Sequence, residues 1–459
     1  MAATRGDRSE RRGLPRGPQA LPREQVAEDQ RERLFDAMVA SINERGFAGT
    51  TISDLVGRAG VSRRSFYEHF ANKEACLLGA FDASAERLTR RLFEAYDPAA
   101  AWDEQVERVT RALLAATLER PDAARLVCVE VAAAGPAGVQ RWARGAARFE
   151  RFLDAVFAQA PGPGTIPAPV AKAYVGALRK ILYSRVSSGQ SVRALRAEME
   201  QLAPELARWL GAYYPSPPAI PGAPRPRRAH GRLTAGRAPG TLATPSRSGP
   251  RGLPAGERSL PKGFVAHNQR ERIFDAIANL TAAKGYPAVG LEDIAAEAAI
   301  SLQTFYRHFE SKADAFMATY EVGHAKTVAI MGEAFASQAD WTGGVRAGMQ
   351  ALFEFLAAEP SYAHLVSVDV LIAFPHMTER MDQASSSYTE LLDVGLGAGR
   401  DQPPSIVTEA VVGGVFELLH DYVLRGRTSR LPELTDHATY IALTPFIGSE
   451  AAAAALGPI

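Results

Sequence analysis

The chain of 459 residues contains only two cysteines, Cys76 and Cys128, which are too few for a framework of disulfides. Metal-binding spacings such as Cys-x-x-Cys are absent, so we expect no metal site and predict that both thiols are small buried side chains. The N-terminus has no apolar stretch of the signal-peptide type, and no apolar run reaches the length of a membrane span. We therefore expect a cytoplasmic protein with no cofactor and no membrane partner.

Net charge and catalytic motifs are equally scarce. The formal net charge is +1, so the total gives no indication of a nucleic-acid partner. The motifs H-E-x-x-H, G-x-S-x-G and G-x-x-x-x-G-K-[ST] are missing. The glycine-rich run at 395–399 lacks the spacing and the preceding strand of a dinucleotide site. We therefore expect that the protein is not an enzyme.

The chain does contain a long internal repeat. Shifting the sequence by 239 residues aligns 12–73 with 251–312, so that "SFYEHFANK" falls on "TFYRHFESK". A weaker similarity at a shift of 237 aligns 175–193 with 412–430. This period is far longer than that of a solenoid repeat, so the sequence predicts a duplicated pair of domains.

Two segments rich in arginine flank the repeats. Residues 1–23 form the first, and 214–259 form a Pro-, Gly- and Arg-rich linker. The linker region from Pro215 to Lys262 has nine basic residues and one acid. Such a segment is typical of a solvated, disordered linker, although it could also lie along DNA phosphates. The predicted organisation is an arm (1–23), a first module divided at residue 82 (24–82 and 83–213), the linker (214–259) and a second module divided at residue 319 (260–319 and 320–459).

Apolar residues recur at spacings of three and four outside these segments, and no convincing strand is present, so we predict an all-α fold. In the first repeat, a helix at 25–45 is expected to stop at Gly46. Thr51 and Asp54 have the spacing of a capping box for a short helix that ends near Ala59. Gly60 suits a tight turn with a positive φ angle, and Ser62 can cap a helix over 62–69. Two short helices joined in this way are typical of a helix-turn-helix motif.

The second helix of such a motif, the recognition helix, enters the major groove with its first residues against the bases. Arg63, Arg64 and Ser65 occupy this turn, and arginine can bind guanine in a bidentate manner. Tyr67, His69 and Lys73 suit phosphate oxygens. Phe66 and Phe70 should face the core.

The stretch "TISDLVGRAGVSRRSFYEHFANKE" resembles the DNA-binding signature of the TetR family of transcriptional regulators, and the second copy resembles it too. The resemblance covers nearly everything outside the arm and the linker. It implies two tandem helical modules, each with a three-helix DNA-binding head and a helical regulatory domain for ligand binding and dimerisation. The heads are head 1 (24–82) and head 2 (260–319), and the domains are regulatory domain 1 (83–213) and regulatory domain 2 (320–459). It also implies a ligand-responsive repressor that binds a double-stranded DNA operator.

The second copy departs from the first where base contacts are expected. Its corresponding base-facing residues are Leu302, Gln303 and Thr304, and its backbone-facing residues are Tyr306, His308 and Lys312. The resemblance also places Thr51 among the backbone-facing residues of head 1. Gly290 stands in place of Thr51, and Ala299 stands in place of Gly60. Head 2 is therefore expected either to prefer a half-site richer in A·T pairs or to bind DNA weakly.

Two heads in one chain suggest an intramolecular pseudo-dimer on an asymmetric operator. The expected interface consists of the helix pairs near 168–186 with 193–213 and 405–425 with 431–447, where Gly176, Gly413 and Gly414 would permit close approach. Alternatively, these helices face the core of their own domain. In one alternative, only head 1 binds DNA, and the second module is a sensor or interaction domain in a homodimer. In another, the protein binds DNA without repressing transcription.

Aromatic residues and methionines provide candidates for a pocket that binds a small apolar ligand. The main candidate positions are Trp102, Trp142, Phe149, Phe152, Trp341, Phe353, Phe374 and Met377. A wider set includes Phe93, Tyr96, Tyr183, Met331, Phe335, Met349, Met381 and Phe416. For most of these side chains, we expect a place in an ordinary helical core rather than in a ligand wall.

Overall fold

The computed structural model describes residues 22–158, 167–188, 190–213, 262–373, 386–389, 392 and 406–456. The predicted linker lies outside these ranges, as does the predicted arm except for its last two residues. The described residues form helices and turns without a strand, which confirms the predicted all-α fold.

Head 1 is formed by α1 (Arg23–Gly49), α2 (Ile52–Ala59) and α3 (Arg63–His69). Gly46 has a φ angle of 69° and interrupts α1, close to the helix end that the sequence predicts. Thr51 and Asp54 form the predicted capping box of α2, and Gly60 follows with a φ angle of 64°. Phe66 and Phe70 are buried as expected. Local sequence signals therefore account for the head.

Head 2 repeats this arrangement with α10 (Lys262–Lys284), the 3-10 helix η2 (Tyr286–Ala288), α11 (Leu291–Glu297) and α12 (Leu302–His308). Ser301 caps α12 as Ser62 caps α3.

Regulatory domain 1 follows without a break, because α4 (Lys73–Ala95) begins directly after α3 and runs through residue 82, where the sequence places the end of the head. Its remaining elements are α5 (Trp102–Glu119), α6 (Pro121–Cys128), η1 (Glu130–Ala134), α7 (Pro136–Phe157), α8 (Ala168–Ser187) and α9 (Val192–Gly211). Cys76 is buried as predicted, whereas Cys128 is only partly buried. Desolvation raises the pKa of the Cys76 thiol to about 12 and that of Cys128 to about 11.

Regulatory domain 2 is built in the same way, and α13 (Lys312–Ala336) again continues directly from its head. The other described elements are α14 (Trp341–Ala358), α15 (Pro360–His364), the π-helix η3 (Leu365–Asp369), α16 (Val370–Ala373), α18 (Ile406–Leu424), η5 (Thr428–Leu434), α19 (Thr435–Ile447) and α20 (Ser449–Ala455). No single helix in the described ranges meets the length and hydropathy of a membrane span. Trp341–Ala358 and Pro360–Ala373 pass together but are bent by 108°.

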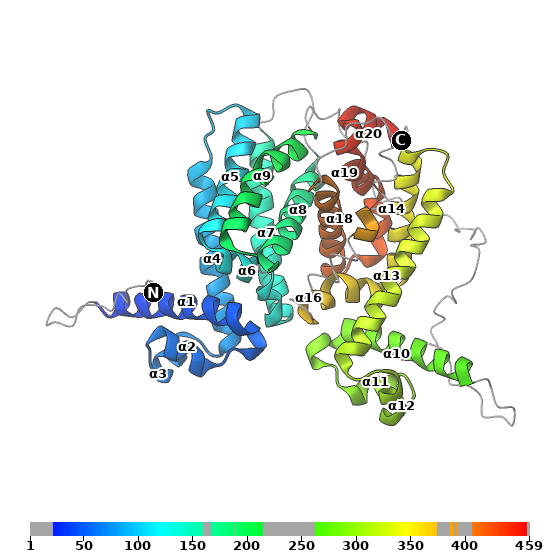
Figure 1. The fold of residues 1–459 in the computed structure, drawn as a ribbon, viewed down its shortest axis with the longest axis horizontal. Coiled ribbons are helices and arrows are strands. Elements are labelled where there is room, and N and C mark those ends of the chain that lie inside the picture. The colour runs from blue at the N-terminus through cyan, green and yellow to red at the C-terminus, as the bar shows by residue number, and fades with distance from the viewer. Residues whose placement is uncertain are drawn as a thin grey trace, which may run out of the picture.

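The two modules lie side by side, with α8 packed along α18 in the middle of the molecule (Figure 1). Both heads lie at the same end of this assembly, with α3 below one module and α12 below the other (Figure 1). The fold therefore presents two helix-turn-helix motifs from one chain on one side.

Candidate functional site

The first turn of α3 is displayed outward by a fixed support. The Ser62 side chain accepts a hydrogen bond from the Ser65 amide at 3.0 Å, which sets where the helix begins. Arg63 and Arg64 follow on the exposed surface, and the Arg64 side chain is 90% exposed, with its Nε donating to Glu68. Phe66 on the opposite face of α3 is fully buried and fixes the helix to the core. The first turn, with Arg63 and Arg64, is therefore accessible to a binding partner.

The predicted phosphate-facing residues of head 1 divide into two groups. Tyr67 is 53% exposed and points a phenol outward, as a backbone contact requires. The Thr51 hydroxyl is also on the surface, but it donates to Asp54 Oδ2 at 2.6 Å within the capping box. Its role on DNA stays a prediction.

Lys73 and His69 hold the head together. The Lys73 ammonium donates to the carbonyl oxygens of Phe47 at 2.8 Å and Thr50 at 3.0 Å, and it lies 4.2 Å from the centre of the Phe47 ring. His69 Nε2 lies 3.2 Å from Gln30 Oε1 on α1. These bonds tie the start of α4 and the end of α3 to α1 and the turn after it, so both residues position the recognition helix whether or not they touch phosphate.

Head 2 repeats these bonds at the same spacing of 239 residues. Lys312 donates to the carbonyl oxygens of Tyr286 and Val289 at 3.0 and 2.8 Å, and burial lowers its pKa. His308 Nε2 lies 3.0 Å from Gln269 Oε1. The duplication therefore preserves the internal support of the recognition helix, although the sequence alone suggested DNA contact for these residues.

The exposed surface of α12 differs from that of α3. Leu302 is 38% exposed, Gln303 is exposed, and Tyr306 is 56% exposed. Thr304 Oγ1 pairs with the Ser301 hydroxyl at 3.0 Å, as Ser65 pairs with Ser62. Head 2 thus presents an apolar and an amide side chain where head 1 presents two cations, on the same scaffold.

The two modules meet through glycines at equivalent positions of α8 and α18. A Cβ on Gly176 would lie 2.5 Å from the Gly413 carbonyl oxygen, and a Cβ on Gly413 would lie 2.9 Å from the Gly176 carbonyl oxygen. A Cβ on Gly176 would also strike Glu417 Cβ, and one on Gly413 would strike Lys180 Cβ at 2.7 Å. The contacts are reciprocal under the shift of 237 residues, which is the pattern of a two-fold related interface. We call this contact of α8 with α18 the seam.

Comparison with known proteins identifies the heads. The family model for bacterial regulatory proteins of the tetR family matches residues 34–80 and again 273–318, which are the two helix-turn-helix segments with their flanking helices. The chain belongs to the TetR family of transcriptional regulators. It carries two tandem TetR modules and is a DNA-binding regulator.

Individual relatives agree with this assignment. The HTH-type transcriptional activator FasR of Mycolicibacterium smegmatis is 24% identical over 153 residues, which cover 32% of this chain and 70% of FasR. The regulator CymR of Pseudomonas putida is 39% identical over 59 residues, which cover 13% of this chain and 29% of CymR.

Solved structures include a TetR-family regulator from Marinobacter aquaeolei at 20% identity and a TM-score of 0.33, covering 38% of this chain and 97% of that one. They also include FadR from Bacillus subtilis in complex with stearoyl-CoA at 17% identity and a TM-score of 0.34, covering 37% and 96%.

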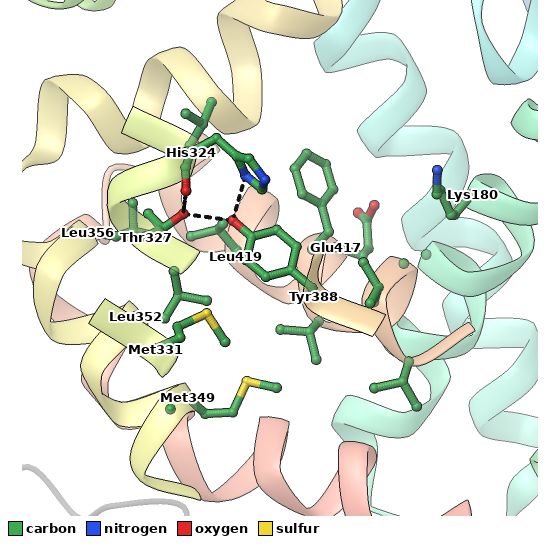
Figure 2. A pocket seen from close by; sticks show the side chains of 18 of the residues that line it. Lys180, His324, Thr327, Met331, Met349, Leu352, Leu356, Tyr388, Glu417 and Leu419 are labelled. Carbon is green, nitrogen blue, oxygen red and sulfur yellow. Dashed lines mark hydrogen bonds between the residues drawn. The ribbon is translucent and has the colours of Figure 1, made fainter. Parts of the chain in front are cut away.

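The second TetR module contains a cavity of about 170 Å³ beside the seam. Its wall combines α13, α14 and α18 of module 2 with Gly176, Lys180 and Tyr183 from α8 of module 1. Figure 2 shows Met331, Met349 and Leu352 on one side of the cavity and Glu417 with Lys180 on another. Because one wall comes from the other module, an occupant would touch both halves of the chain.

A small polar cluster lies in this apolar wall. Tyr388 Oη lies 2.8 Å from Thr327 Oγ1 and 3.1 Å from His324 Nδ1, as the dashed lines in Figure 2 show. Thr327 donates its own proton to the His324 carbonyl oxygen at 2.7 Å, so Tyr388 donates to Thr327 and accepts from His324 Nδ1. Burial lowers the pKa of His324, which keeps the ring neutral. His324 Nε2 is therefore a lone-pair acceptor, buried and without a hydrogen-bond partner among the described residues.

The predicted pocket residues lie elsewhere. Trp142 stacks under the Arg179 guanidinium at 4.3 Å, Phe149 and Phe152 stack on each other, and Trp102 packs against the core. Trp341 donates to the Leu392 carbonyl oxygen, and Phe353 is fully buried. None of these six lines the cavity, while Phe374 and Met377 fall outside the described residues. Their ligand role stays a prediction that this cavity does not support.

Five members of the wider set do line the cavity, namely Tyr183, Met331, Phe335, Met349 and Phe416. The sequence reasoning missed His324, Thr327 and Tyr388. A signal for two of them was present, because 320, 324, 327 and 331 form one stripe of α13 in which polar residues interrupt an apolar face.

Proposed function

We propose that this regulator works as an intramolecular pseudo-dimer that binds an asymmetric operator through two unlike heads. The main support is the seam, which joins the modules of one chain through reciprocal glycine contacts while both recognition helices lie at one end (Figure 1). Homodimeric DNA-binding proteins bind operators that have the same two-fold symmetry as the protein. A pair of unlike heads is therefore expected to bind an operator whose two halves differ.

Within this proposal, Arg63 and Arg64 contact guanines from head 1, with Ser65 beside them. Gln303 contacts adenine and Leu302 packs on a thymine methyl from head 2. Thr51, Tyr67 and Tyr306 contact phosphates. Lys73, His69, Lys312 and His308 act mainly as supports for the recognition helices, with any DNA contact secondary.

The test is affinity for a DNA site selected from a random pool, measured with one head altered at a time. Arg63→Ala and Arg64→Ala should each weaken binding by roughly 5- to 150-fold and relax the sequence preference in one half-site. Gln303→Ala should do the same in the other half-site. If Gln303→Ala and Tyr306→Ala both leave affinity unchanged, only head 1 binds DNA and the second module is a sensor or interaction domain.

We also propose that the cavity binds one small ligand per chain and that the ligand has an apolar body with a hydroxyl or N–H donor. The sulfur- and leucine-lined wall suits the body, and the unpartnered His324 Nε2 suits the donor. Since α13 lines the cavity and also begins at the end of head 2, a ligand there can change how the heads are held. A bound alcohol should protect the wild type in thermal melting more than it protects His324→Phe.

The sign of regulation we propose is repression relieved by this ligand, as the resemblance to the family suggests. The FasR relative is named as an activator, so the test must distinguish both signs. A reporter carrying the selected operator should lose expression when the protein is supplied and regain it with the ligand. A rise in expression on supplying the protein would instead make it an activator.

A further inference from the structure

The charges along the seam are divided between the modules. Module 1 contributes Lys172 and Arg185 from α8, and module 2 contributes Glu409 and Asp421 from α18. Arg185 Nη1 lies 2.5 Å from Glu409, and Lys172 Nζ lies 3.3 Å from Asp421 Oδ1. All four side chains are at most 20% exposed, so these pairs are poorly screened by solvent.

The internal similarity of the modules indicates which charged residues would face each other if two copies of the same module paired. Under the shift of 237 residues, Lys172 corresponds to Glu409 and Ser184 corresponds to Asp421. If two copies of module 1 paired by the same geometry, Arg185 would face Lys172 of the second copy. If two copies of module 2 paired, Asp421 would face Glu409 of the second copy. Each like pairing therefore replaces both attractive pairs and creates a repulsion on each side of the axis.

We propose that the seam is a specificity device, which pairs module 1 with module 2 and disfavours pairing of either module with its own kind. The inference rests on the proposed pseudo-dimer and explains how a duplicated domain avoids the homodimers that its symmetry would otherwise permit. Buried charge pairs of this kind discriminate between partners more than they add stability. The partner that the α18 surface selects is a helix of the same shape with basic side chains, and α8 of the same chain supplies it at high effective concentration.

Neighbouring charges within each module moderate the effect. Lys172 also pairs with Glu150 at 2.9 Å, and Arg185 also pairs with Glu198 at 3.0 Å. Asp421 also pairs with Arg425 and Arg427. Glu417, opposite Arg179 at 3.6 Å, has its pKa raised to about 8 by burial and is mostly protonated at neutral pH. The selectivity is therefore carried by Arg185 with Glu409 and Lys172 with Asp421.

The test is the mass of the full chain in light scattering after one charge is reversed. Glu409→Arg places a second guanidinium against Arg185 within the chain, but in a pairing of two copies of module 2 the new cation faces Asp421 favourably on both sides. The variant should therefore form dimers of chains at micromolar concentration, while the wild type has the mass of one chain. Glu409→Gln is the matched control, since it removes the same ion pair without creating the new one. It should keep the mass of one chain.

A second substitution tests whether an attractive charge pair within the chain restores the mass of one chain. Adding Arg185→Glu to Glu409→Arg restores an attractive pair within the chain, in reverse. The same two changes make both like pairings attractive as well, so the modules of one chain should pair with each other because their effective concentration is higher, and the mass should return to one chain. Equal behaviour of Glu409→Arg and Glu409→Gln would overturn the charge rule. A dimer of wild-type chains would instead contradict the proposed pseudo-dimer. The charge rule is tested separately, by the differences in mass between the variants.

Discussion

Ala299 shows how the second head departs from the first at the level of one residue. It has a φ angle of 50° and is the one non-glycine residue with a positive φ angle in the described part of the chain. Its equivalent in head 1 is Gly60, at a φ angle of 64°. The left-handed region costs a residue with a Cβ about 1–2 kcal/mol, so head 2 carries strain in its turn that head 1 avoids.

We predict that Ala299→Gly raises the free energy of unfolding by up to about 1 kcal/mol, because relief of the strain exceeds the added chain entropy. Gly60→Ala should lower it by a similar amount. Hydrogen exchange of the helices on each side of the turn provides the measurement. Ala296→Gly, at an exposed site inside α11, is the control and should be destabilising. A loss of protection in Ala299→Gly equal to that in the control would contradict the assignment of strain.

The buried carboxyl of Glu417 predicts a dependence of stability on pH. Burial raises its pKa to about 8, whereas the unfolded chain has the ordinary value near 4.5. The folded state therefore holds a proton that the unfolded state releases. The contribution of Glu417 to stability is complete below pH 4.5 and is lost as the pH rises toward 8. His420 acts in the opposite sense, because burial lowers its pKa to about 4 and its cost appears as the pH falls below 6.5.

Between pH 6.5 and 8, the wild type should lose stability relative to Glu417→Gln by up to about 1.4 kcal/mol per pH unit. Denaturant unfolding at several pH values measures the difference. Parallel curves for the two proteins would show that Glu417 ionises normally in the folded chain.

At the scale of elements, the sequence accounts for the heads and for the seam but not for the cavity. Capping residues and turn glycines act within a few positions, so the heads could be predicted from local chemistry. Gly176 and Gly413 were recognisable because a small residue on a helix permits close approach. The cavity depends on side chains from α8, α13 and α18 that meet only after the modules pack, and Tyr388 joins His324 across 64 residues. No local pattern contains that information.

Gly176 tests the seam as a contact between helices. Gly176→Ala should destabilise the pairing of α8 with α18 by roughly 1–3 kcal/mol, because the new Cβ meets backbone and Cβ atoms that cannot rotate away. Gly332→Ala is the matched control, since a Cβ there meets nothing within 4 Å and helix propensity favours alanine by about 1 kcal/mol. Thermal melting of the two variants should therefore shift in opposite directions. Stabilisation by both would show that the helices do not approach closely.

For the whole molecule, the proposed pseudo-dimer makes one chain the counterpart of an ordinary dimer. Two heads with the same internal bonds but different exposed side chains are held on one side by a seam of unlike charge. The sequence predicted the duplication and the difference between the heads, because both can be read position by position. It could not predict the relation between the heads in space, which depends on how α8 and α18 cross.

The mass of the protein–DNA complex on a site selected from a random DNA pool tests the central claim most directly. The proposed pseudo-dimer predicts one chain per duplex and a site whose two halves differ, with guanines in the half bound by head 1. Two chains on a palindromic site would contradict it, since each chain would then contribute one working head.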